Sequence, residues 1–171
     1  SETLFRLPNG FHCYRGNKTA LVNLELPHQN RGHITFGSFN NISKLTPEVI
    51  KVWSKILNAV PQSHLLLKNS LVTHSLSHYA QLFKQEGISE DRIEYYGHLP
   101  SDHEHLELYG AIDIGLDPFP YNGVTTTCEA LWMGVPVITL AGDRHAGRVG
   151  ASISTNVGLT DFIALDIDGY I

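Results

Sequence analysis

The sequence has 171 residues, of which 42% are hydrophobic and 17% are charged, and its formal net charge is -5 at pH 7. This length suits one compact domain with a tail. The acidic balance argues against broad binding to nucleic acids or membrane surfaces, which requires basic stripes. The two cysteines, Cys13 and Cys128, suggest neither a disulfide framework nor a zinc site. We therefore expect a reducing, cytoplasmic setting.

Residues 1–32 show no sustained hydrophobic period and are interrupted by glycines and prolines. Such a composition is typical of linkers and loops, so we interpret this segment as a linker or the end of a preceding domain. Residues 33–171 have the regular pattern of a folded domain. Because the sequence starts at Ser1 without an initiator methionine, we interpret it as a piece of a longer protein.

From residue 34 onward, strand and helix patterns alternate. Residues 34–39 predict a strand, and Thr46 followed by Pro47 is typical of a helix start. Apolar residues then recur at helical spacing, at Val49, Val52, Trp53, Ile56, Leu57 and Val60. The remaining expected elements are strands at 65–67, 92–96, 111–116 and 135–140, and helices at 74–86, 102–109, 126–133 and 145–155.

This alternation predicts the fold class. Strands joined by helical crossovers form a parallel sheet with helices on both faces, so we expect an α/β fold with a Rossmann-like doubly wound parallel sheet. Ligands of such sheets bind beyond the carboxyl ends of the strands. Three polar segments fall at that edge, namely residues 39–44, 97–105 and 118–129.

The segment that follows the strand at 111–116 carries the clearest chemical signal. Pro, Asn and Gly in residues 117–123 predict a turn, and Thr125 and Thr126 then stand where the next helix begins. A helix N-terminus has unpaired N–H groups and a partial positive charge, which suits an anion. Glu129 lies one turn further on, where it could accept hydrogen bonds from ribose hydroxyls. These residues favour a nucleotide diphosphate.

Each of these signals also has a purely structural interpretation. The threonines could cap the helix, and Glu129 could interact only with the helix dipole. Asn41 and Lys44 could reach a diphosphate as a donor and a point charge, or they could belong to a polar loop. His105 could contact a base or a phosphate, or it could simply occupy one face of its helix.

The histidines do not build a metal site in the sequence. His74 and His78 have the four-residue helical spacing that zinc sites use, and His103 and His105 flank Glu104. No HExxH motif, cysteine pair or obvious third ligand accompanies them. The glycine-rich dinucleotide fingerprint and the P-loop are also absent from the sequence. We therefore expect no metal and no resident cofactor.

Three stretches closely resemble the carboxyl-terminal catalytic half of the O-GlcNAc transferase family, which includes plant SPINDLY-type O-fucosyltransferases and bacterial proteins with tetratricopeptide repeats. They are residues 34–44, 125–137 and 144–150. The resemblance implies a GT-B glycosyltransferase with two Rossmann-like lobes, of which residues 33–171 would be the carboxyl-terminal, sugar-nucleotide-binding lobe. Residues 1–32 would then end the amino-terminal catalytic lobe, and tetratricopeptide repeats in cis are a further expectation.

The resemblance also implies roles for seven residues. These are Asn41 and Lys44 at the diphosphate, Thr125 and Thr126 at the phosphates, Glu129 at the ribose, and Pro100 (through its backbone) and His105 at the base. Lys44 would also be catalytic, because together with the helix N-terminus it would stabilise charge on the leaving diphosphate.

Some positions depart from the pattern of O-GlcNAc transferases and resemble the SPINDLY branch. Val124 stands where His is usual, Asp102 where Lys is often found, and Asn41 and Glu129 where Gln and Asp are common. The donor therefore stays open between a UDP-sugar and a GDP-sugar carrying GlcNAc, fucose or another hexose. The implied reaction transfers that sugar to Ser or Thr of a protein or peptide acceptor. The alternatives are a sugar-nucleotide epimerase lobe and a non-catalytic nucleotide-sugar-binding module.

Overall fold

The structure, a computed structural model, describes residues 3, 5, 7–69 and 73–171, with residues 73–75 described by their backbone alone. Its six strands form one parallel sheet in the order β3-β2-β1-β4-β5-β6. Their bounds are β1 Thr35–Ser38, β2 His64–Lys68, β3 Ile93–Tyr96, β4 Ile114–Leu116, β5 Val137–Leu140 and β6 Ile163–Ala164. This is the doubly wound order, in which chain progression reverses between β1 and β4. It confirms the predicted α/β fold.

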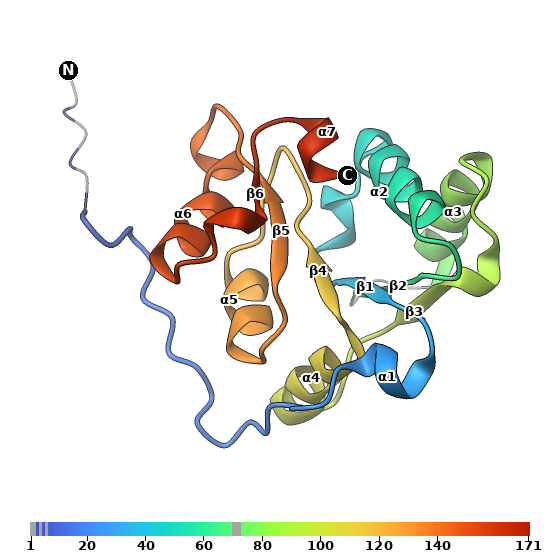
Figure 1. The fold of residues 1–171 in the computed structure, drawn as a ribbon, viewed down its shortest axis with the longest axis horizontal. Helices are drawn as coiled ribbons and strands as arrows, with labels where there is room; N and C mark the ends of the chain where they lie inside the picture. Colours follow the sequence, from blue (N-terminus) through green and yellow to red (C-terminus); the bar gives the residue numbers. More distant parts are fainter. Residues whose placement is uncertain (1–2, 4, 6, 70–72) are drawn as a thin grey trace.

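Seven α-helices and five 3₁₀ turns accompany the described strands, with α1 before β1 and α7 after β6. Figure 1 shows their arrangement around the sheet. The α-helices are α1 Pro27–Arg31, α2 Pro47–Ala59, α3 Thr73–Gln85, α4 Asp102–Glu107, α5 Thr125–Trp132, α6 Val149–Asn156 and α7 Ile167–Tyr170. The 3₁₀ turns are η1 Ile42–Lys44, η2 Glu90–Arg92, η3 Leu108–Ala111, η4 His145–Gly147 and η5 Thr160–Phe162.

Strand β2, which has a neighbour on each side, shows why both faces of the sheet must be covered. Leu65 and Leu67 belong to a core shared with α2, α3 and α7, whereas Leu66 belongs to a second core shared with α4 and α5. All three leucines are buried. A strand with buried side chains on both faces is the pattern of parallel sheets, and it accounts for the uninterrupted apolar run in the sequence.

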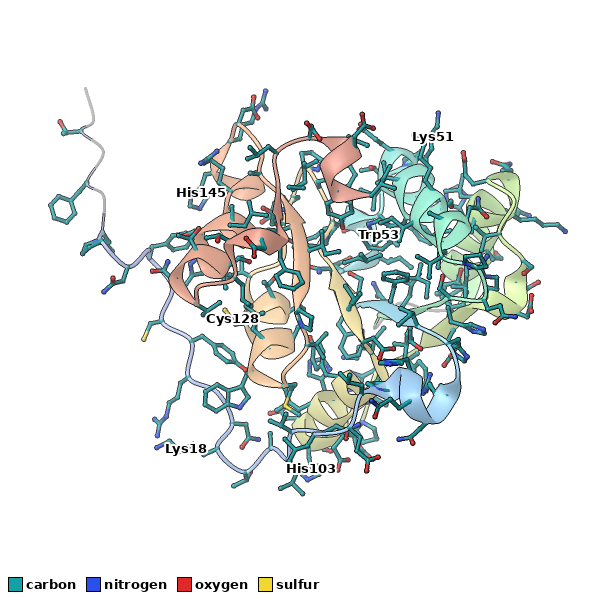
Figure 2. The ribbon with its side chains drawn as sticks, in the orientation of Figure 1. Lys18, Lys51, Trp53, His103, Cys128 and His145 are labelled. Carbon is teal, nitrogen blue, oxygen red and sulfur yellow. The ribbon has the colours of Figure 1, made fainter. Side chains whose placement is uncertain are left out.

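Helix α2 begins as its sequence predicts. The Thr46 hydroxyl accepts a hydrogen bond from the Val49 amide over 3.3 Å, and Pro47 occupies the first helical position. From this helix Trp53 points into the core, where it is fully buried (Figure 2). Its indole nitrogen donates to the hydroxyl of Tyr170 over 3.1 Å, which ties the end of the chain to α2.

Three short elements, α1, β6 and α7, were not expected, because segments of two to five residues carry no readable periodicity. The strand expected at 111–116 starts only at Ile114, since the chain before it forms η3. The helix expected at 145–155 is divided into η4 and α6. Described residues of the N-terminal segment run outside α6 and α5 toward α4 (Figure 1). The division of the chain at residue 32 stays a prediction.

Candidate functional site

A cleft of about 650 Å³ opens at the carboxyl ends of β1 and β4, where the strand order reverses. Its walls come from the loop after β1, the loop after β4 and the first turn of α5. The lining residues are Asn40, Asn41, Ser43, Lys44, Thr46, Phe119, Pro120, Tyr121, Val124, Thr125 and Thr126. Four predicted site residues, Asn41, Lys44, Thr125 and Thr126, thus share one cleft.

Lys44 brings a positive charge to this cleft from η1. Its ammonium donates to the main-chain carbonyl of Asn122 over 2.8 Å and to Asn40 Oδ1 over 3.3 Å. The same nitrogen lies 4.4 Å from the centre of the Tyr121 ring, a cation–π contact. Burial lowers the pKa of Lys44, and the nearby carboxylate of Asp117 opposes that shift. The charge is therefore held in place before any ligand binds.

The two asparagines after β1 have different partners. Asn41 is exposed and its Oδ1 accepts from the Ser43 amide over 3.0 Å, which caps η1. Asn40 is buried, and its Oδ1 accepts from Lys44 and from the Thr126 hydroxyl over 3.1 Å. Sequence reasoning chose Asn41 and missed Asn40. The only signal in the sequence was that two amides follow the strand.

The first turn of α5 lines the cleft through Thr125 and Thr126. The first backbone hydrogen bond of the helix runs from Cys128 to the Val124 carbonyl over 3.0 Å, so the amides of Thr125 and Thr126 precede the helical ladder. Gly123 packs closely here, because an added Cβ would lie 2.7 Å from Thr126 Oγ1. The helix dipole and Lys44 together make the cleft suitable for an anion.

Glu129 belongs to a neighbouring cluster rather than to the cleft lining. Its Oε2 lies 3.0 Å from His105 Nε2 and 3.2 Å from the Tyr109 hydroxyl, which is also 3.2 Å from the Thr126 carbonyl. Burial first, and then the charge of Glu129, raise the pKa of Tyr109 well above its ordinary value. Tyr109 therefore stays a neutral hydrogen-bond donor that links Glu129 to the first turn of α5.

Of the other predicted site residues, His105 belongs to this cluster and Pro100 stands before α4. His105 is on α4, and its Nδ1 is buried without a hydrogen-bond partner among the described residues. Pro100 is exposed and directly precedes Ser101, the N-cap of α4. Neither residue lines the cleft. The roles assigned to all seven predicted residues stay predictions.

Sequence reasoning also missed Asp117, the residue that follows β4. Its side chain is buried, Oδ1 accepts from the Gly123 amide over 2.6 Å, and Oδ2 accepts from the Thr139 hydroxyl over 2.7 Å. Burial raises the pKa of Asp117 to about 7, although both hydrogen bonds and Lys44 oppose the shift. The Tyr170 hydroxyl donates to the Asp117 carbonyl over 2.8 Å. An acidic residue directly after an apolar strand was the available signal.

The structure adds observations about the histidines and about membranes. Within the part of the chain that it describes, no three His, Cys, Asp or Glu side chains gather closely enough to hold a metal ion. His78 is exposed, and the side chain of His74 lies outside the described residues. His103 pairs with Glu107 on the exposed side of α4, far from His145 (Figure 2). No described helix is long and apolar enough to cross a membrane.

Among solved structures, an O-GlcNAc transferase mutant from Thermobaculum terrenum matches with a TM-score of 0.78 and 37% identity, over 81% of this chain and 27% of that one. The C-terminal domain of a glycosyl transferase group 1 family protein from Francisella tularensis matches with a TM-score of 0.55 and 20% identity, over 77% of this chain and 68% of that one. The second match supports the fold alone.

Curated proteins match over nearly the whole chain. A probable UDP-N-acetylglucosamine–peptide N-acetylglucosaminyltransferase, SPINDLY of Solanum lycopersicum, is 42% identical over 99% of this chain and 18% of its own length. The similarly described SEC protein of Arabidopsis thaliana is 30% identical over 93% of this chain and 17% of its own length. The chain thus spans less than a fifth of these relatives.

The sequence profile described as glycosyl transferase family 41 matches residues 19–171. This match and the SPINDLY relatives confirm the resemblance stated from the sequence. They also agree with the six-stranded parallel sheet and with the fold of the matched structures. The chain therefore belongs to glycosyl transferase family 41.

Proposed function

We propose that this chain is the donor-binding lobe of a glycosyltransferase that moves a sugar from a nucleotide diphosphate sugar to Ser or Thr hydroxyls of proteins. The observation that carries the proposal is the cleft at the strand-order reversal, where the Lys44 ammonium and the open N-terminus of α5 lie together. The relatives support the reaction class, since they are described as probable UDP-N-acetylglucosamine–peptide N-acetylglucosaminyltransferases.

The chemistry follows from where charge develops. When the bond between the sugar carbon and the diphosphate oxygen breaks, the electron pair stays on the diphosphate and its negative charge grows. Lys44 and the amides of Thr125 and Thr126 would stabilise that charge. Because Asn122 and Asn40 already hold the ammonium, little reorganisation is needed as the bond breaks. The proposal uses no resident cofactor.

The nucleoside would extend from the cleft along α5 toward α4. Glu129 would accept from the ribose hydroxyls, because an ionised carboxylate accepts strongly from two O–H groups. His105, which already contacts Glu129, and the backbone of Pro100 would lie at the base. Asn41 would donate to the diphosphate, and the base itself stays open between uracil and guanine.

Activation of the acceptor hydroxyl is assigned to a residue outside this cleft. No Asp, Glu or His is among the described residues that line it, so the walls supply no general base. An epimerase would also need acid and base groups beside the sugar, which favours transfer. The proposed partners in cis are an amino-terminal catalytic lobe and tetratricopeptide repeats, and the proposed setting is the cytoplasm.

Calorimetry and thermal unfolding with UDP, GDP, UDP-GlcNAc and GDP-fucose test the proposal. A ligand that binds only the folded state raises its stability by about 2.7 kcal/mol at a concentration of 100 Kd. We expect one base to be preferred and its nucleotide sugar to bind. If all four ligands fail to bind or stabilise the folded chain, the donor-site proposal is wrong.

A further inference from the structure

Two buried carboxylates stand at opposite ends of β4. Asp113, before the strand, accepts from the His28 amide over 3.0 Å and from the Thr35 amide over 2.8 Å. Asp117, after the strand, accepts from the Gly123 amide over 2.6 Å. Both side chains accept hydrogen bonds from backbone amides, Asp113 from distant segments of the chain and Asp117 from the loop that follows it. Such hydrogen bonds are how a buried charge is normally satisfied. Only Asp117 lies at the edge that carries the cleft.

One peptide group connects Asp117 to Lys44. The carbonyl of Asn122 accepts from the Lys44 ammonium over 2.8 Å, and the N–H of Gly123 donates to Asp117 Oδ1 over 2.6 Å. This carbonyl and this N–H belong to the same peptide bond, whose atoms lie close to one plane. Any rotation that frees the N–H from Asp117 therefore also turns the carbonyl that holds Lys44.

The same peptide group sets the start of α5. Gly123 directly precedes Val124, the N-cap of the helix. A Cβ on Gly123 would lie 2.7 Å from Thr126 Oγ1 and 2.9 Å from Asn40 Oδ1, so this loop has little room to shift. The position of Gly123 consequently fixes where the first-turn amides of Thr125 and Thr126 meet the cleft.

The carboxylate itself has little freedom to move. Thr139 donates to its Oδ2 over 2.7 Å, and Gly150 of α6 packs so closely that an added Cβ would collide with Oδ2 and with the Thr139 hydroxyl. Asn122 is fully buried and its side chain is fixed between the Pro118 carbonyl, at 3.1 Å, and the Gly150 amide, at 3.3 Å. Contacts from Thr139 of β5 and Gly150 of α6 therefore hold the loop in place.

We propose that Asp117 is a positioning residue of the donor site, which, through the peptide group between Asn122 and Gly123, places the Lys44 ammonium and the N-terminus of α5. Asp117 lines no part of the cleft, so it acts through its neighbours and not by contact with the ligand. The inference rests on the proposed function only in taking a nucleotide diphosphate sugar as the ligand.

The test compares Asp117→Ala with Asp113→Ala, a matched loss of a buried carboxylate at the other end of β4. Calorimetry uses UDP-GlcNAc and GDP-fucose, and urea unfolding gives the stability of each variant. We expect both variants to be less stable, but only Asp117→Ala to lose affinity, by about tenfold or more. Asp117→Asn should restore affinity to within about threefold, because its amide can accept from Gly123 and donate to Thr139.

A double-mutant cycle adds a readout that a merely structural role would not change. If Asp117 acts through Lys44, the loss caused by Lys44→Met should be smaller in the Asp117→Ala background than in the wild type. Additive losses would overturn the inference, as would equal affinity losses in the Asp117→Ala and Asp113→Ala variants or unchanged affinity in Asp117→Ala. If Asp117→Ala does not fold, Thr139→Val replaces it, and unchanged affinity in that variant overturns the inference.

The failure of the proposed function would look different. In that case the wild-type chain binds neither nucleotide sugar. If the wild type binds one of them and the Asp117 variants bind it equally well, only the positioning role fails.

Discussion

Thr126 and Asn40, 86 positions apart in the chain, are joined by a hydrogen bond of 3.1 Å from Thr126 Oγ1 to Asn40 Oδ1. The same oxygen accepts from Lys44 Nζ over 3.3 Å. The loop after β1 and the first turn of α5 are thus fastened to each other where the strand order reverses. A diphosphate would enter a site whose polar atoms already have fixed places.

Lys44→Ala should weaken the binding of UDP or GDP by about 1.5–3 kcal/mol, the range for hydrogen bonds to charged groups. Calorimetry measures the effect. Lys51→Ala is the matched control, because Lys51 is an exposed lysine on α2 (Figure 2) and its loss changes the net charge equally. Equal affinity in the wild type and the Lys44 variant would remove Lys44 from the diphosphate site.

Glu129→Gln should weaken a ribose nucleotide much more than inorganic pyrophosphate. The ionised carboxylate accepts strongly from two hydroxyls, whereas pyrophosphate has none to offer. In the structure Tyr109 and His105 both contact Oε2, and Oε1 has no hydrogen bond among the described residues. Competition calorimetry with both ligands gives the ratio. Equal losses for the two ligands would mean that Glu129 only supports the end of α5.

The sequence predicted those elements whose signals are local. Thr46 and Pro47 start α2, and Gly134 has a φ of 83° just beyond α5, which a glycine adopts readily. The apolar run at 65–67 became a strand buried on both faces. By contrast, the helix α7 rests on tertiary contacts, since Tyr170 bonds both Trp53 and the Asp117 carbonyl. A four-residue helix is too short to show a hydrophobic period, so the sequence did not predict α7.

The meeting of Lys44 and Thr126 in one cleft followed from the order of the elements and not from local signals. Alternating elements require that the segments after the parallel strands meet at one edge, so Lys44 and Thr126 were expected there together. Asn40 is buried, whereas Asn41 is exposed and caps η1. Two adjacent amides in the sequence do not show which of them takes which position. The support from Asp117 depends on Thr139 and Gly123, which are distant from each other in sequence.

Asp117 should give the folded chain a pH-dependent stability. The ordinary pKa of this carboxyl is 3.8, and in the folded chain burial raises it to about 7. Between these values the folded state keeps a proton that the unfolded state releases, so the free energy of unfolding falls as pH rises. Each unit of pKa difference corresponds to about 1.4 kcal/mol, so this contribution is on the order of 1–4 kcal/mol.

Urea unfolding of the wild type and Asp117→Asn at pH 5, 6, 7 and 8 checks this linkage. The asparagine cannot titrate, so the stability of the wild type relative to the variant should decrease from pH 5 to pH 8. Asp143→Asn, at an exposed position, controls for the change in net charge. A wild-type advantage that stays constant, or one that grows with pH, would contradict the raised pKa of Asp117.

The 171-residue chain should bind the donor but not transfer its sugar, even with an acceptor peptide present. The described lining of the cleft offers Lys44 and threonines but no carboxylate or imidazole to take the proton of an acceptor hydroxyl. A second wall is also needed to hold the acceptor in line with the sugar, because positioning supplies a large share of the rate.

A radiolabelled-sugar assay measures this directly when it compares the chain alone with the chain joined to the proposed amino-terminal lobe. We expect transfer only by the two-lobed form, and we expect calorimetry to detect binding of the nucleotide sugar by both forms. Lys44→Ala in the two-lobed form should then lower transfer, because charge on the leaving diphosphate would lose its main counter-charge. Robust transfer by the 171-residue chain alone would show that its own residues activate the acceptor. It would overturn the proposal that this chain binds the donor while a residue of the other lobe activates the acceptor.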